Sequence, residues 1–276
     1  MVTVVQAATQ FRNQITGLVR FSYPAIGGFA TESADMAALQ ARLYDPERLA
    51  RRFDLFERLA LPSLLAQTDG DFRTLFLIGR DMPTAWRDRL ADLVAPLAGA
   101  KIVALDPLPH YQAIRRAYAL GLPDEATHLT GFRLDDDDAM DRGFVARMRA
   151  TVAALLPVAG LDAPLVTGCN RGFFLERKPE GNLIYAVTEK NPIGLGLAMT
   201  VPRGSPENIF RRNHRHCSQY YSTFTDVMAP AFLRSVHSDN DSDPHASGKI
   251  ERCEWADVAA EVEAHFPFTV AQLQAL

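Results

Sequence analysis

Segments typical of strands and of helices alternate along the first part of this 276-residue chain. Short apolar runs, of the kind that form buried strands, are separated by segments whose apolar residues recur at helical spacing. The strand-like runs are residues 15–21, 72–78, 101–105 and 128–134. The helix-like segments are residues 46–65, 84–97, 111–120 and 141–156. Connections this long exclude hairpins, so the pattern predicts an α/β fold with a mainly parallel sheet flanked by helices.

The pattern changes after residue 160. Three short strand-like runs follow, separated by turns, at residues 165–169, 172–175 and 183–187. Their spacing predicts a mixed or antiparallel second half, and residues 256–266 read as a closing helix. Because no linker-like stretch divides the sequence, we predict a single domain over residues 1–276.

Composition excludes several classes of protein. The 33 acids and 29 bases leave a formal net charge of −4, which does not provide the basic surface typical of nucleic-acid binding. No apolar run approaches the length of about 18 residues that a membrane span needs. The three widely spaced cysteines predict neither a disulfide framework nor a CxxC zinc site. The first residues lack the features of a signal peptide, so we expect a cytoplasmic protein. Peripheral attachment to a membrane stays compatible with this expectation.

The four adjacent carboxylates Asp135 to Asp138 form the most unusual local feature of the sequence. Grouping like charges costs free energy unless solvent or a cation compensates them. This run follows a predicted parallel strand, and ligands of open α/β sheets bind beyond the carboxyl ends of such strands. The acids therefore lie where a ligand is expected.

Two explanations of the acidic run stay open at this stage. Alternate residues that leave a strand point the same way, so Asp135 and Asp137 can share one site and hold Mg²⁺ or Mn²⁺ through hard oxygen ligands. Alternatively, the acids are solvated or cap the next helix. Calcium binding of the EF-hand type is disfavoured, because the sixth and twelfth positions counted from Asp135 are Met140 and Ala146.

With the flanking residues, this strand–acidic turn–helix resembles the DXD region of GT-A glycosyltransferases. The rest of the chain resembles one branch of them, the rhamnosyltransferase family of bacteria. The pieces that carry the resemblance occur in order along roughly residues 15–245. They are residues 20–23 (RFSY), 56–68 (FERLALPSLLAQT), 72–78 (FRTLFLI), 133–140 (RLDDDDAM), 193–197 (IGLGL) and 237–242 (HSDNDS). The acidic motif alone is weakly specific, whereas the ordered set is much more so.

The resemblance implies a GT-A-like, Rossmann-type fold and a transferase that uses a nucleotide sugar. Residues 15–156 would then bind the nucleotide sugar and residues 157–276 would form the acceptor side. It further implies that the end of the first strand and the following loop lie against the nucleotide. The residues concerned are Arg20, Phe21, Ser22 and Tyr23.

The resemblance also implies a divalent metal, Mn²⁺ or Mg²⁺, that bridges the donor diphosphate. Asp135 and Asp137 are the matching DXD carboxylates, and His237 is the best match for a histidine that completes the metal shell. Because all four residues of the run are aspartates, the register stays open, and Asp136 and Asp138 are the alternative pair.

Other residues fit the chemistry of such a transfer. Arg133, Arg211 and Arg212 are candidates for phosphate contacts, because a guanidinium pairs well with phosphate oxygens. An inverting transferase also needs a general base for the acceptor hydroxyl. The candidate bases are Glu189, Asp226 and Asp239, and a surface acid is the simpler explanation of each.

We therefore expect a metal-dependent glycosyltransferase that moves a sugar, rhamnose by the family description, onto a bacterial surface or capsular glycan or a lipid-linked acceptor. One alternative is an Mg²⁺-dependent phosphoryl-transfer or hydrolytic enzyme, although the P-loop sequence GxxxxGK[ST] is absent. Another is a non-catalytic protein that binds nucleotides or glycans.

Overall fold

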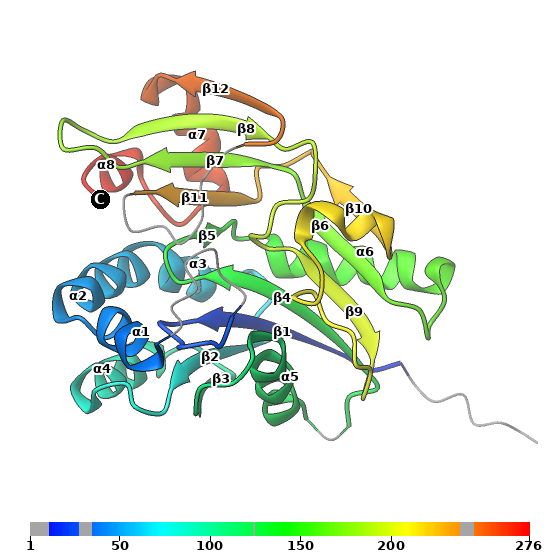
Figure 1. Cartoon of the computed structure of the whole chain (residues 1–276). Coiled ribbons are helices and arrows are strands. Elements are labelled where there is room, and N and C mark those ends of the chain that lie inside the picture. Colours follow the sequence, from blue (N-terminus) through cyan, green and yellow to red (C-terminus); the bar gives the residue numbers. More distant parts are fainter. Residues whose placement is uncertain (1–10, 28–34, 124, 238–245) are drawn as a thin grey trace, which may run out of the picture.

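A central sheet organises the computed structural model, which describes residues 11–27, 35–123, 125–237 and 246–276 (Figure 1). Within this part of the chain the sheet has seven strands, in the order β10-β6-β9-β4-β1-β2-β3. The strands are β1 (Asn13–Arg20), β2 (Arg73–Gly79), β3 (Ala100–Leu105), β4 (His128–Asp135), β6 (Leu165–Cys169), β9 (Ala198–Pro202) and β10 (Ser222–Asp226). The first four are parallel, and β9 runs antiparallel between β4 and β6. The predicted α/β class with a mainly parallel sheet flanked by helices is confirmed.

The strand order reverses between β1 and β4. From β1 the chain proceeds through β2 to β3 on one side, and it then returns to place β4 on the other side of β1. In the β1–β4 register, Arg20 lies opposite Asp135 at the carboxyl ends of the two strands. Such a switch point opens a crevice for ligands, so the topology places the acidic run at its edge.

Helices cover both faces of the central sheet. One face packs against α2 (Pro46–Leu55), α3 (Leu61–Leu65), α4 (Thr84–Val94) and α6 (Phe144–Ala159). The other face packs against α5 (His110–Gly121). The predicted helix over residues 46–65 forms α2 and α3, joined by the π-helical turn η1 (Phe56–Ala60). The short helix α1 (Met36–Leu43), which the sequence analysis missed, precedes α2.

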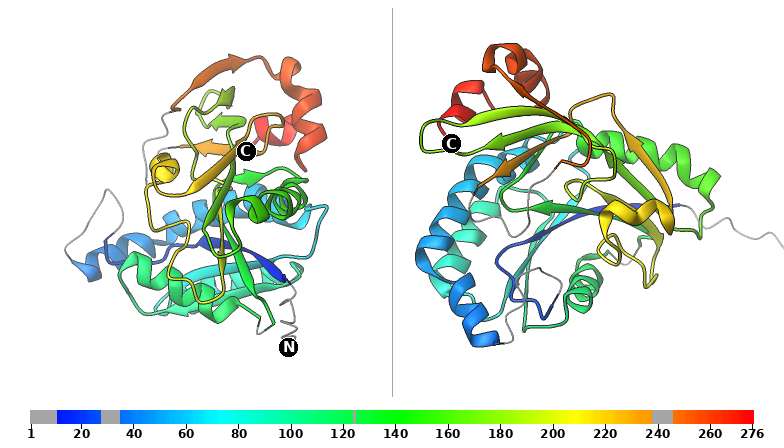
Figure 2. Two further views of the ribbon diagram at one scale, coloured as in Figure 1. Left: turned by 90° about the vertical axis from the view of Figure 1, so that its right-hand side faces the viewer. Right: turned by 45° about the horizontal axis from the view of Figure 1, so that its top comes forward.

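The second half of the chain adds a second sheet, in the order β12-β8-β7-β11-β5. Its strands are β5 (Ala139–Met140), β7 (Arg171–Glu176), β8 (Leu183–Thr188), β11 (Phe232–Val236) and β12 (Lys249–Cys253). Figure 2 shows α7 (Trp255–His265) and α8 (Val270–Gln274) beside this sheet, where Val262 and Phe266 pack against Phe173 and Leu233. The predicted mixed pairing of the second half is confirmed. The strands β5, β9, β10, β11 and β12 were not predicted, because each forms only through partners distant in sequence.

Residues 203–216 include four arginines and two histidines. They form loops that run into the 3-10 helix η2 (His214–Gln219). None of the helices that the structure describes is both long and apolar enough to cross a lipid bilayer.

The close approach of β7 and β11 depends on the absence of a side chain at Gly172. A Cβ at this position would lie 2.3 Å from the carbonyl oxygen of Phe232, which is backbone and cannot move aside. We expect Gly172→Ala to lower the free energy of unfolding by about 1–3 kcal/mol. Gly70→Ala is the matched control, because nothing lies within 4 Å of its added Cβ. Urea denaturation measures both, and equal stability of the two variants would contradict this packing.

Candidate functional site

The acidic run turns from the end of β4 into β5 and is largely buried. Asp136 is fully buried, and Asp137 and Asp138 are each 4% exposed. Only the side chain of Asp135 has substantial contact with solvent, at 43% exposure. The explanation of the run as solvated surface acids is therefore wrong, because three of the four carboxylates are removed from water.

Arg52 on α2 compensates the buried charges. Its Nε donates to Asp136 Oδ2 at 3.0 Å, its Nη2 donates to Asp136 Oδ1, and its Nη1 donates to Asp137 Oδ2 at 2.8 Å. The guanidinium is itself buried. A planar, permanently charged fork suits two carboxylates at once. The sequence analysis missed Arg52. The only indication in the sequence is that Arg52 follows Arg48 by four residues, so both lie on one side of the helix, next to the apolar residues Leu49 and Phe53.

Asp137 contacts His237 as predicted for the metal site. His237 Nε2 lies 3.0 Å from Asp137 Oδ2, and both side chains are more than nine-tenths buried. Burial by itself raises the pKa of Asp137, but Arg52 and His237 outweigh it and hold that pKa well below its usual value. Asp137 is therefore a carboxylate at neutral pH.

The members of the run have different partners in the protein. Both oxygens of Asp136 accept from Arg52, and Asp138 Oδ1 accepts from the backbone N–H of Ser235 on β11 at 2.9 Å. Burial and the neighbouring Asp137 raise the pKa of Asp138 well above its usual value. Asp136 and Asp138 thus bond to the protein and Asp135 keeps contact with solvent, while the pairing of Asp135 with Asp137 around a ligand stays a prediction.

Cationic side chains gather on the other side of Asp135. Arg20 Nη2 donates to Asp135 Oδ1 at 3.1 Å, and Arg20 Nη1 lies 3.2 Å from His110 Nε2. Burial raises the pKa of Asp135, but Arg20 and Arg133 outweigh it and lower that pKa. The ring of Phe210 lies beneath both guanidinium groups, 5.8 Å from the Arg20 carbon and 4.8 Å from that of Arg133.

Arg133 has unused hydrogen-bonding capacity. Its Nε is buried and has no hydrogen-bond partner among the described residues. A Cβ added at Gly194 would lie 3.2 Å from Arg133 Nη2, so the backbone at Gly194 comes close to this guanidinium. A buried donor without a partner is costly, which supports an anionic ligand at this point.

The side chains of the residues that follow β1 make contacts within the protein. Phe21 is fully buried between Phe53 and Phe56, so its side chain is not available to a nucleotide, contrary to the prediction. The Tyr23 hydroxyl accepts from the backbone N–H of Leu108 and donates to the carbonyl of Asp106, so this side chain joins the loop after β1 to the loop after β3.

Ser22 adopts a left-handed backbone conformation, with φ of 50°, that non-glycine residues seldom take. Its hydroxyl accepts a hydrogen bond from Arg48 Nη1 at 3.0 Å. Arg48 and Arg52, one turn apart on α2, therefore contact the chain after β1 and after β4, respectively.

Arg211 and Arg212 contact their own part of the chain. Arg211 pairs with Glu207 and lies over Tyr111, with 5.9 Å between the guanidinium carbon and the ring centre. Arg212 lies over Tyr220 at 4.5 Å. No described contact links either residue to the acidic run, so their proposed role in phosphate binding stays a prediction.

The candidate bases are not brought together. Glu189 is buried and accepts from the backbone N–H of Ser247 at 2.6 Å and from its hydroxyl, which fits a role in holding the chain before β12. Asp226 ends β10, where its Oδ1 accepts from the N–H of Met228 at 2.8 Å. Asp239 lies outside the described residues.

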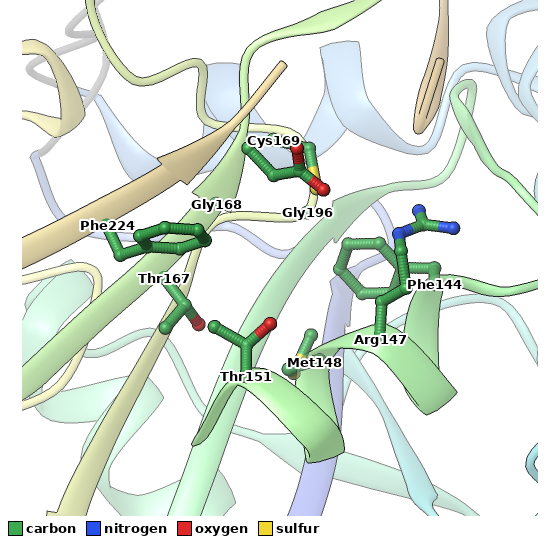
Figure 3. Close-up of a pocket in the computed structure, with 10 residues that line it drawn as sticks. Phe144, Arg147, Met148, Thr151, Thr167, Gly168, Cys169, Gly196 and Phe224 are labelled. Atoms are coloured by element: carbon green, nitrogen blue, oxygen red, sulfur yellow. The ribbon is translucent and has the colours of Figure 1, made fainter. Parts of the chain in front are cut away.

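Asp226 lines a small pocket between α6 and the strands β6 and β10. Figure 3 shows Arg147 and Phe144 of α6 facing Thr167, Cys169 and Phe224 across this pocket. Burial raises the pKa of the Cys169 thiol to about 11, so this cysteine is a neutral thiol at physiological pH. The pocket is separate from the acidic run.

The residues at the switch point offer an incomplete shell for a metal ion. Among the described residues, no group of three or more histidine, cysteine, aspartate or glutamate side chains converges closely enough to enclose a metal. Asp137 and His237 do converge, and their separation of 3.0 Å matches the spacing of about 3 Å between neighbouring ligands of one ion with bonds near 2.1 Å. The donor set therefore fits an ion that also takes ligands from a substrate, as Mg²⁺ and Mn²⁺ do.

The family comparison identifies the class of protein as a sugar transferase. A family model described as "Putative rhamnosyl transferase" matches residues 14–249. The chain belongs to this family of glycosyltransferases, which confirms the family predicted from the sequence motifs. A search of curated proteins found no match.

Solved structures of transferases resemble the chain only remotely. The S. aureus TarS fragment 1–349 in complex with UDP has a TM-score of 0.40 and 10% identity, over 81% of this chain and 60% of that one. The same fragment with UDP-GlcNAc has a TM-score of 0.38 and 10% identity, over 94% and 69%. Mouse xyloside xylosyltransferase 1 has a TM-score of 0.30 and 12% identity, over 56% and 52%.

The buried ion pairs of Arg52 predict a large effect on stability. Removing one partner of a buried pair leaves uncompensated charges, so Arg52→Leu should lower the free energy of unfolding by about 3–5 kcal/mol. Arg51→Leu removes an adjacent, half-exposed arginine that pairs with Glu47 on the surface, and it should cost at most about 1 kcal/mol. Chemical denaturation measures the free energy of unfolding of both variants. A similar decrease in both would contradict the role of Arg52 in compensating the buried carboxylates.

The histidine beside Arg20 predicts a pH effect. Burial, with Arg20 and Arg133 nearby, lowers the pKa of His110 to about 4, whereas the unfolded chain titrates near 6.5. Between these values the unfolded state binds a proton that the native state does not, so stability falls as the pH drops from 6.5 toward 4. Between pH 7 and pH 5, the free energy of unfolding of His110→Gln should therefore fall by about 1–2 kcal/mol less than that of wild type. Urea denaturation at both pH values tests this, with the exposed His216→Gln as control.

Proposed function

We propose that the chain transfers a sugar from a nucleotide-sugar donor in a reaction that depends on a divalent metal ion. The observation that carries this proposal is the set of side chains at the switch point. Asp137 contacts His237, and the neighbouring Asp135 has the guanidinium groups of Arg20 and Arg133 close by. A metal-bound diphosphate needs both kinds of partner, because the ion takes hard ligands and the phosphate oxygens take cationic donors.

In this proposal Asp137 and His237 hold the ion directly, and the donor diphosphate supplies further ligands, while Asp135 keeps Arg20 beside the site. The ion, Mn²⁺ or Mg²⁺, would stabilise the negative charge that grows on the nucleoside diphosphate as the bond to the sugar breaks. Arg133 donates its unpaired Nε to a phosphate oxygen, and Arg20 donates from the Asp135 side. Phe210 keeps the two guanidinium groups in place from below.

The proposal also covers the identity of the transferred sugar, the donor and the acceptor. The family description supports rhamnose as the transferred sugar. The UDP and UDP-GlcNAc complexes of TarS support a nucleoside-diphosphate donor. For the acceptor we propose a glycan of the bacterial surface or capsule, free or linked to a lipid. We further propose that the reaction takes place in the cytoplasm or at the inner face of the membrane.

A ligand panel tests the donor. The purified chain is heated with each common nucleoside diphosphate and nucleotide sugar, with and without Mn²⁺. A ligand that binds only the native state raises the apparent melting temperature, so the correct base and sugar give the largest shift, and only with the metal. Stabilisation by free sugars alone, independent of metal and nucleotide, would instead indicate a glycan-binding protein.

Asp137→Asn tests the metal ligand in the reaction itself. The amide keeps the size of the side chain but removes the negative charge, so we expect transfer to fall by at least about 100-fold. Asp88→Asn on the exposed face of α4 is the control and should keep wild-type activity. The measurement is transfer of labelled sugar to acceptor. Wild-type activity of Asp137→Asn would refute the metal site, and release of free sugar as the main product would indicate a hydrolase.

A further inference from the structure

Guanidinium groups already compensate the carboxylates at the end of β4 before any ligand binds. Asp136 and Asp137 share Arg52, and Asp135 contacts Arg20. Arg133 lies near enough to Asp135 to help lower its pKa. Three carboxylates therefore face three permanent cations, and the acidic run has a much weaker negative field than its sequence suggests.

Arg52 differs from the other two cations in how firmly it is held. Its side chain is 8% exposed, and all its described bonds run to the two carboxylates. It extends from the last turn of α2, a helix anchored by Leu49 and Phe53 in the core. An arginine does not lose its proton in proteins, so this charge is permanent.

A divalent ion at Asp137 must therefore bind beside a fixed positive charge. Asp137 Oδ2 already accepts from Arg52 at 2.8 Å and lies 3.0 Å from His237 Nε2. An added dication gains less from a carboxylate that a guanidinium has already neutralised. A donor diphosphate brings further negative charge and restores the attraction.

We propose that Arg52 is a resident counter-cation that makes binding of the divalent ion dependent on a diphosphate. This inference rests on the proposed function and deepens it. Arg52 is a positioning residue, because it acts through Asp136 and Asp137 and contacts neither metal nor sugar. The arrangement keeps the empty enzyme from retaining a metal ion and makes the ion enter together with its donor.

Metal binding without turnover tests this inference. Equilibrium dialysis measures bound Mn²⁺ per chain, with MnCl₂ alone and with inorganic pyrophosphate, which supplies the diphosphate without assuming a base. Wild type should bind Mn²⁺ at least about 10-fold more tightly when pyrophosphate is present, a difference of about 1.4 kcal/mol. Arg52→Gln should bind Mn²⁺ alone at least about 10-fold more tightly than wild type and lose most of the gain from pyrophosphate.

Two matched variants separate this role from a merely structural one. Arg52→Lys keeps the positive charge and should keep the wild-type dependence on pyrophosphate. Arg51→Gln, the exposed neighbour, should also behave as wild type. Circular dichroism at the dialysis temperature shows which variants are folded.

Asp136→Asn provides the test if Arg52→Gln does not fold. It leaves Arg52 with one carboxylate instead of two, so the site becomes more positive and Mn²⁺ should bind more weakly than to wild type, even with pyrophosphate.

The possible results separate this inference from the proposed function. If wild type binds Mn²⁺ with pyrophosphate and both Arg52→Gln and Asp136→Asn match it, the inference on Arg52 is overturned while the metal site stands. If no variant binds Mn²⁺ under either condition, the metal-dependent function fails as well.

Discussion

The contact of Arg52 with Asp136 and Asp137 is the interaction on which the rest of the site depends. Adjacent carboxylates at the edge of a sheet repel one another, and burial makes that repulsion stronger because little water screens it. The guanidinium on α2 supplies the opposite charge in a fixed geometry. With this contact in place, the chain can bury most of an acidic turn and still present Asp137 as a carboxylate beside His237.

The topology of the sheet explains why these groups meet. The parallel strands β1 and β4 are neighbours because the chain reverses its direction of winding there, and their carboxyl ends bring Arg20 opposite Asp135. The second sheet then brings His237, which directly follows β11, to the acidic turn, because β11 pairs with β5 immediately after that turn. The side chains of the site come from β1, α2, β4 with the turn that follows it, and the residue after β11, so the site exists only in the folded chain.

Much of the fold and part of the site could be predicted from local patterns. The four parallel strands and their covering helices followed from hydrophobic periodicity, because each element buries its own apolar face. The buried position of Arg52 was not predicted, because a charged residue on an amphipathic helix usually faces solvent. Phe21 was assigned to the nucleotide for its position after β1, although its ring packs between Phe53 and Phe56. The strand β5 has only two residues, which is too short for an alternating pattern to be recognised in the sequence.

The sequence by itself determined the class of fold, the family and the place of the acidic run, because these follow from periodicity, strand length and ordered motifs. Only the tertiary structure decided which carboxylates are buried and which partner each one contacts. Four identical aspartates carry no local signal that separates them. Their roles differ because Arg52, Ser235 and His237, distant along the chain, contact different members of the run.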